Sequence, residues 1–381
     1  MKNRGDPEKM SAPKPIFKKW VFVLAPLGFI IFIFYLLGLD LGTLGSVISQ
    51  ANWVFFAAAI GCVLGAVVCN TLSWQQLLRN LQVKTSFQRV FKLSWVGIFV
   101  DALVPGGWSG DIFKSYLLSK DKNIHGAKVA ASTVLKNVLE LFVTLGAIVA
   151  GIILLTLNYA VEASVLFTIG TIMFLLALPL LITIYLSTNL HAAERLLTGF
   201  KRLLARLKGK EADSIAMEGK LRASLQEFHN GITELRSKPK SLIRPIAFQT
   251  LAWAFEVLAL FMVFASLGTF VSVDKVVITN TLVVGLQTQG VALAGFAQVV
   301  SSTLYTVLGI TPILAVASTL LAGIATFWFK MAVSAVAFHR AMVSPGFSLR
   351  SRLGGFRRFD GFKLSEPEIA LSADGLASGA P

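Results

Sequence analysis

The sequence predicts an all-α membrane protein, a polytopic helix bundle with six full spans and two re-entrant hairpins. Of its 381 residues, 55% are hydrophobic and only 14% are charged, whereas water-soluble domains carry about 25% charged residues. The stretches 21–39 and 141–157 contain no Lys, Arg, Asp or Glu. Because about 20 apolar residues in a helix cross the roughly 30 Å hydrocarbon core of a bilayer, such stretches are expected to span a membrane.

Six apolar segments are long enough for full spans, although hydropathy alone would give seven or eight. Trp53 and Trp74 bracket the second segment, as interfacial aromatic residues tend to do. The first segment is too long and too aromatic for the core of a signal peptide, so we expect it to be retained. The six segments are 20–38, 53–77, 129–157, 163–187, 246–268 and 312–338.

Two further apolar segments, 93–104 and 276–307, are predicted to enter the membrane and turn back. The first has a helix of about 12 residues, roughly 18 Å long, which is too short to cross and stops at Pro105. If the hairpin 93–119 returns to the side from which it enters, 32 of the 35 Lys and Arg residues lie on the cytoplasmic side. The positive-inside rule favours that topology, with both termini cytoplasmic and the protein in the cell membrane.

Because each full span changes the side of the membrane, the same topology makes 276–307 enter from the opposite side. Two re-entrant hairpins of opposite sense, each before a long helix, predict an inverted-topology repeat of the kind found in transporters. The alternative is that 276–307 is an ordinary helix pair.

Charge divides the chain into three parts: a basic cytoplasmic tail at 1–19, a transmembrane domain at 20–340, and a basic, aromatic tail at 341–381 that becomes rich in Ala, Gly and Ser. Within the second part, 190–240 is predicted to be an amphipathic cytoplasmic loop. Anionic lipid headgroups are the expected partners of the net charge of +15. No nucleic-acid partner is expected.

The most informative motif surrounds the turn of the first hairpin. Pro105 ends the descending helix, and the glycines after it permit positive φ. Ser109 or Asp111 is expected to cap the ascending helix, whose first amides can hold an anion such as a lipid phosphate. The alternative is a structural turn in which Asp111 caps its own helix and Lys114 faces headgroups. The predicted headgroup-binding residues are Gly106, Gly107, Ser109, Gly110, Asp111 and Lys114.

Five ionisable residues fall in or beside apolar segments. Burying such a charge in a membrane costs roughly 2.5–3.5 kcal/mol, so these residues usually pair or line a wet cavity. Lys136 and Glu140 are four residues apart and can pair along one helix face, which is the structural interpretation. The functional interpretation places all five around a polar path beside the first hairpin: Asp101, Lys136, Glu140, Glu256 and Lys330.

These segments resemble the flippase-like membrane family. The resemblance covers 20–340 and rests on Leu-Val-Pro-Gly-Gly-Trp-Ser-Gly-Asp at 103–111, Lys-Ser-Tyr-Leu-Leu at 114–118, Trp-Gln-Gln-Leu-Leu at 74–78 and Ala-Ala-Ser-Thr-Val-Leu at 130–135. The family includes the transmembrane region of lysylphosphatidylglycerol synthase, which moves an aminoacylated lipid between leaflets. The resemblance therefore implies a membrane phospholipid or lipid-linked substrate.

The chain departs from the family pattern at two places. Asn137 stands where Arg is usual, with Lys136 beside it and Glu140 at the acidic position. In the second half the family usually reads Pro-Gly-Gly-x-Gly-x-x-Glu, whereas this chain has Val-Ala-Leu-Ala-Gly-Phe-Ala-Gln at 291–298. The second hairpin is therefore expected to be a weaker headgroup site than the first.

The favoured function is movement of a lipid or lipid-linked headgroup between leaflets. One alternative is a proton-coupled transporter of a small polar solute that uses Glu140 or Glu256. Another is a non-transporting partner that recruits a cytosolic enzyme through 190–240. The sequence has no nucleotide-binding loop, no nucleophile constellation and no metal-ligand spacing, and the segment after the sixth span is short. We therefore expect no cofactor, no metal and no enzymatic activity.

Overall fold

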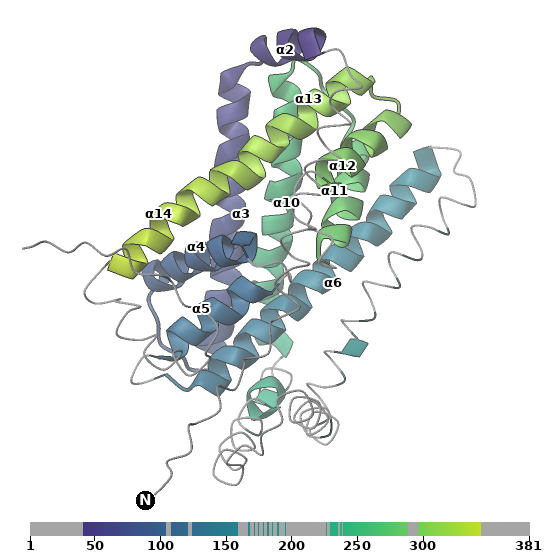
Figure 1. The fold of residues 1–381 in the computed structure, drawn as a ribbon. Coiled ribbons are helices and arrows are strands. Elements are labelled where there is room, and N and C mark those ends of the chain that lie inside the picture. The colour runs from purple at the N-terminus through teal and green to yellow at the C-terminus, as the bar shows by residue number, and fades with distance from the viewer. Residues whose placement is uncertain are drawn as a thin grey trace, which may run out of the picture. The chain divides into compact units, whose positions relative to one another are not determined.

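A computed structural model describes residues 41–103, 108–120, 124–158, 229–234, 239–288 and 296–343, together with isolated positions between 167 and 237. Every secondary-structure element in these ranges is a helix (Figure 1). The predicted all-α class is confirmed.

The chain divides into two units, Met1–Phe338 and His339–Pro381. The first unit holds all the described helices except the end of the last one.

Four helices are long and apolar enough to cross a membrane. They match four of the six predicted spans, so the prediction of a polytopic membrane protein is confirmed. The predicted spans 20–38 and 163–187, the tails and the 190–240 loop lie wholly or mostly outside the described residues. The four are α3 (Trp53–Asn80), α6 (Gly126–Asn158), the segment Pro239–Ser266 formed by η1 (Pro239–Leu242) and α10 (Ile243–Ser266), and the segment Pro312–Ala341.

The last span contains a change of helix type. It begins as α13 (Pro312–Gly323), passes through a π-helical turn at Ile324–Trp328 and continues as α14 (Phe329–Val343). Such turns are rare and occur often at functional sites. Lys330 lies directly beyond this one.

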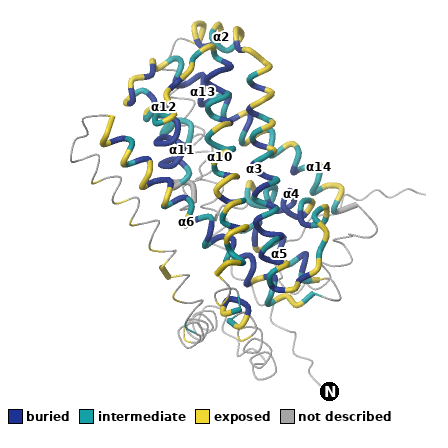
Figure 2. The backbone as a smooth tube through the Cα atoms, turned by 180° about the vertical axis from the view of Figure 1, so that it is seen from behind, coloured by how far each residue is buried: buried dark blue, intermediate teal, exposed yellow. Residues whose placement is uncertain are grey.

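Helices α3 and α10 form an antiparallel pair, which lies side by side in both views (Figures 1 and 2). At one end, the Asn52 amide donates to the Ser266 carbonyl at 2.6 Å. At the other, the Asn80 side-chain amide donates to the Ser241 carbonyl at 2.9 Å. Hydrogen bonds at both ends fix the register of the pair, and the remaining helices pack around it.

Two pairs of short helices follow the two members of this central pair. The lengths of the four helices are about 25, 17, 24 and 18 Å at about 1.5 Å per residue, below the roughly 30 Å needed to cross. Residues 104–107 and 289–295, which join the members of each pair, lie outside the described residues. The pairs are α4 (Phe87–Leu103) with α5 (Ser109–Ser119), and α11 (Val273–Thr288) with α12 (Phe296–Val307).

The first short helix begins at Phe87 instead of the predicted 93. The prediction was wrong because it followed apolar residues alone, whereas the polar turn with Arg89 and Lys92 is also helical.

The order of long helix, short pair and long helix occurs twice, once from α3 to α6 and once from α10 to α14. Because α3 and α10 are antiparallel, the two sets have opposite sense, in agreement with the predicted inverted repeat. The second pair packs against α6, where Ile148 and Leu155 meet Ile278 and Leu282 of α11. Figure 2 shows buried positions along α4, α5 and α11.

Surface cysteines can test the first hairpin. In a protein whose Cys62 and Cys69 are replaced by Ala, we expect Lys92→Cys and Lys120→Cys to react with a membrane-impermeant maleimide from the same side, because both positions are exposed at the open end of the α4–α5 pair. Ser272→Cys, exposed between α10 and α11, should react only from the other side. Labelling of Lys92→Cys and Lys120→Cys from opposite sides would contradict the hairpin.

Candidate functional site

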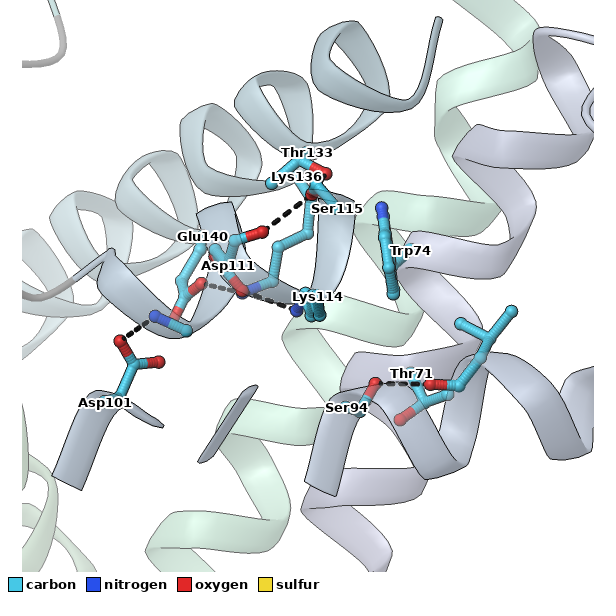
Figure 3. A network of polar contacts seen from close by, with 12 residues as sticks. Thr71, Trp74, Ser94, Asp101, Asp111, Lys114, Ser115, Thr133, Lys136 and Glu140 are labelled. Atoms are coloured by element: carbon cyan, nitrogen blue, oxygen red, sulfur yellow. Dashed lines mark hydrogen bonds and ion pairs between the residues drawn. The ribbon is translucent and has the colours of Figure 1, made fainter. Parts of the chain in front are cut away.

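Four charged side chains form a continuous network between α5 and α6 (Figure 3). On α5, Lys114 Nζ lies 2.5 Å from Asp111 Oδ1. The other oxygen of Asp111, Oδ2, lies 3.4 Å from Lys136 Nζ on α6, and Lys136 Nζ lies 2.6 Å from Glu140 Oε2. Two positive and two negative groups alternate, so their formal charges cancel.

Sequence spacing explains half of this charge network. Asp111 and Lys114 are three residues apart and Lys136 and Glu140 four, so each pair shares a helix face. The link from Asp111 to Lys136 depends on the packing of α5 against α6, which a hydrogen bond of 2.6 Å between the Ser115 and Thr133 hydroxyls also supports. The structural interpretation of Lys136 and Glu140 as an ion pair is thus confirmed, but the pair belongs to a larger network.

Burial of the network is uneven. Lys114 and Lys136 are each 7% exposed and Asp111 11%, whereas Glu140 is 37% exposed. Buried charges are tolerated only with close partners, and Asp111 supplies one oxygen to each lysine. The alternative in which Lys114 faces lipid headgroups is wrong, because its side chain is buried.

Trp74 of α3 packs against the network. Lys114 Nζ lies 4.5 Å from the centroid of the Trp74 ring, a cation–π contact, and Trp74 Nε1 donates to Ser132 Oγ at 3.2 Å. Trp74 is fully buried, so its ring faces neighbouring helices and not lipid. Its position places α3, α5 and α6 in contact around one ammonium group.

The cap of α5 comes from the other helix of the hairpin. Asp101 Oδ1, near the end of α4, accepts hydrogen bonds from the Gly110 amide at 2.6 Å and from the Ser109 hydroxyl at 2.9 Å. The first helical turn is preceded by Trp108, which makes no side-chain cap. The predictions that Ser109 or Asp111 caps α5 are therefore wrong: a carboxylate from α4 takes that place, and Asp111 instead pairs with lysines.

This cap also occupies the predicted anion site at the start of α5. The Gly110 amide already binds the Asp101 carboxylate, so a lipid phosphate there would have to displace it. Gly106 and Gly107 lie outside the described residues.

The charge network borders a cavity of about 240 Å³. All five predicted path residues line it, although they come from α4, α6, α10 and α14. Glu256 and Lys330, the two that are most distant in sequence from the hairpin, have no ion-pair partner within 4.0 Å among the described residues. The charged lining residues are Asp101, Asp111, Lys114, Lys136, Glu140, Glu256 and Lys330.

A second cavity, of about 270 Å³, lies among α3 and α10–α14. The two cavities share three lining residues, Ala66, Glu256 and Lys330. Sequence reasoning missed this second cavity because most of its polar lining residues are neutral and scattered over several helices. Within the described ranges, no group of three or more His, Cys, Asp and Glu side chains is placed to hold a metal ion.

Comparisons with known proteins extend the resemblance found in the sequence. Residues 21–334 match the family described as lysylphosphatidylglycerol synthase TM region. A UPF0104 membrane protein of Pyrococcus horikoshii is 22% identical over 325 residues, which cover 82% of this chain and 93% of the relative. One from Methanocaldococcus jannaschii is 26% identical over 316 residues, covering 80% and 90%. One from Methanothermobacter thermautotrophicus is 21% identical over 311 residues, covering 80% and 90%.

The crossing of α4 and α5 predicts a strong effect of a single methyl group. A Cβ at Gly110 would overlap the Gly97 carbonyl oxygen, so we expect Gly110→Ala to lower the free energy of unfolding by about 1–3 kcal/mol. Gly61→Ala is the control, because a Cβ there has no neighbour within 4 Å. Thermal unfolding in detergent measures both, and equal stability of the two variants would contradict the close crossing.

The charge network predicts non-additive losses of stability. Asp111→Asn leaves two buried lysines with one carboxylate and should cost about 3–5 kcal/mol. The double variant Asp111→Asn with Lys114→Met removes one charge of each sign. It should therefore be more stable than the sum of the two single changes predicts. Denaturant unfolding of the four proteins measures this coupling, and strictly additive losses would show that the charges do not interact.

Proposed function

Because the chain belongs to the family of the lysylphosphatidylglycerol synthase transmembrane region, we propose that it moves the headgroup of a membrane lipid or lipid-linked compound between leaflets. In this proposal the protein lies in the cell membrane with both termini cytoplasmic. The observation that carries the proposal is the cavity lined by seven charged side chains inside the group of apolar helices. Such charges within a membrane domain usually mark a substrate path.

Two kinds of charged residue line this cavity, and we assign them different roles. Asp111, Lys114 and Lys136 satisfy one another and hold the wall in place. Glu256 and Lys330 lack ion-pair partners among the described residues, so a carboxylate and an ammonium remain to meet a ligand. A headgroup that carries a phosphate and an amine matches both, because phosphate binds ammonium and amine binds carboxylate.

The same arrangement separates the two parts of a lipid. Polar groups line the cavity, whereas the outer faces of the long helices carry exposed apolar residues such as Phe142 and Ile153 of α6. A headgroup can cross through the cavity while its acyl chains remain among apolar surroundings. The reaction then requires no covalent chemistry from the protein.

Lipid transport in liposomes tests this function. Glu256→Gln and Lys330→Gln should each slow the translocation of a fluorescent phospholipid by about tenfold or more, the equivalent of roughly 1.4 kcal/mol, because each removes one charge that meets the headgroup. Glu234→Gln and Lys275→Gln make the same chemical changes at residues that line neither cavity and should leave the rate unchanged.

Two outcomes would overturn the proposal. One is normal lipid translocation by folded Glu256→Gln and Lys330→Gln proteins. The other is uptake of a small solute that depends on a proton gradient, with no lipid movement. Parallel assays of phospholipids with different headgroups identify the headgroup charge that the protein transports best.

A further inference from the structure

The second cavity is lined by neutral polar side chains. Hydroxyl and amide groups come from α11, α12 and α13, and its two charged lining residues, Glu256 and Lys330, also line the first cavity. The polar lining therefore differs between the two cavities. Most polar side chains that line the first cavity are charged, whereas most of those that line the second are neutral. The neutral polar lining residues include Thr279, Asn280, Gln298, Ser301, Ser318 and Thr319.

Three of these residues have buried polar atoms without a hydrogen-bond partner in the described part of the chain: Thr279 Oγ1, Asn280 Nδ2 and Gln298 Oε1. Thr279 is 1% exposed and Asn280 8%, so the protein itself shields them. Buried polar groups nearly always have partners, and leaving one unpaired destabilises a fold. A ligand that satisfies all three would be held by hydrogen bonds that the protein does not otherwise make.

The unpaired atoms constrain the chemistry of that ligand. The Asn280 amide nitrogen donates, the Gln298 amide oxygen accepts, and the Thr279 hydroxyl does both. A phosphate or carboxylate accepts only and would leave the Gln298 amide oxygen unpaired. An ammonium donates only and would leave the Asn280 amide nitrogen unpaired. A set of hydroxyl groups donates and accepts, and so matches all three.

The walls of the cavity suit the carbon skeleton of such a ligand. Phe264 and Tyr305 line it and pack edge to face, with ring centroids 4.9 Å apart. Both are almost fully buried, so they offer a rigid apolar surface beside the neutral polar groups. A water molecule takes roughly 30 Å³ in the liquid, so a cavity of about 270 Å³ has room for a sugar ring.

We propose that this second cavity binds an uncharged polyhydroxylated group, such as the sugar ring of a glycosylated lipid. The proposal rests on the proposed function where that group belongs to a lipid. A free sugar presents the same hydroxyl chemistry, and the experiment separates the two sources.

Binding to the full-length protein in nanodiscs tests this site with three probes: a monoglucosyl diacylglycerol, free methyl glucoside and phosphatidylglycerol. We expect the glucosyl lipid to bind and phosphatidylglycerol not to displace it. Thr279→Val and Asn280→Leu should each weaken binding about tenfold or more, since each removes a buried hydrogen bond to the ligand. Thr156→Val and Asn158→Leu on α6 are the matched controls, because neither residue lines either of the two cavities.

Stability separates a binding role from a structural one. Because Thr279 Oγ1 has no partner among the described residues, Thr279→Val should leave the thermal stability of the empty protein unchanged or raise it, while it weakens binding. A variant that loses stability and binding together would overturn the proposal, since the hydroxyl would then serve the fold. A ligand-independent rise in stability without any change in binding would overturn it as well.

The probes distinguish failure of this site from failure of lipid transport. Binding of methyl glucoside without translocation of any lipid supports the neutral site and shows that the bound sugar is free and not part of a lipid. Translocation of phospholipid without binding of either sugar probe overturns the neutral site and leaves the proposed function standing. Equal competition by phosphatidylglycerol overturns the selectivity for uncharged groups.

Discussion

The contact between Asp111 and Lys136 is the interaction on which the first hairpin depends. Helix α5 has 11 residues, too few to be stable by itself in water or to span a bilayer. The Asp111 carboxylate shares its two oxygens between Lys114 of the same helix and Lys136 of α6. Each lysine is buried, so loss of the carboxylate would leave uncompensated charge at a cost of several kcal/mol. This requirement keeps α5 against α6 and gives the cavity its charged wall.

Local pattern was sufficient to predict the helices and insufficient to predict their partners. The spans around α3, α6 and α10 are long apolar runs, and their length predicts that they cross a membrane. The four-residue spacing of Lys136 and Glu140 predicts that the two side chains pair. The cap of α5 shows where this reasoning stops. Capping preferences predicted that Ser109 or Asp111 caps α5. Helix α4 packs beside α5, however, and its Asp101 carboxylate accepts the hydrogen bond from the Gly110 amide. Cross-helix contacts of this kind depend on packing, which one sequence does not display.

The two cavities differ in what their walls leave unsatisfied. In the first, most charges already have partners, and the proposed function assigns the headgroup to Glu256 and Lys330, which have no ion-pair partner among the described residues. In the second, Thr279, Asn280 and Gln298 have neutral polar atoms without a partner among the described residues, and our proposal of a hydroxyl-rich ligand rests on these atoms. Gln298 stands where the resembled family usually has Glu, so this position contributes an amide to the second cavity in place of a carboxylate. If the second cavity binds hydroxyl groups as we propose, the departure from the family pattern changes the ligand chemistry of this cavity.

The π-helical turn in the last span orients Lys330, which lines both cavities. Residues Ile324–Trp328 form it, and Lys330 lies directly beyond. A π turn contains one residue more than an α turn, and one residue rotates the following helix by about 100°. Without that extra residue, the side chain of Lys330 would turn away from Glu256 and from the lining that the two cavities share. The π turn therefore sets the direction of Lys330, the only ammonium group that borders both cavities in the described part of the chain.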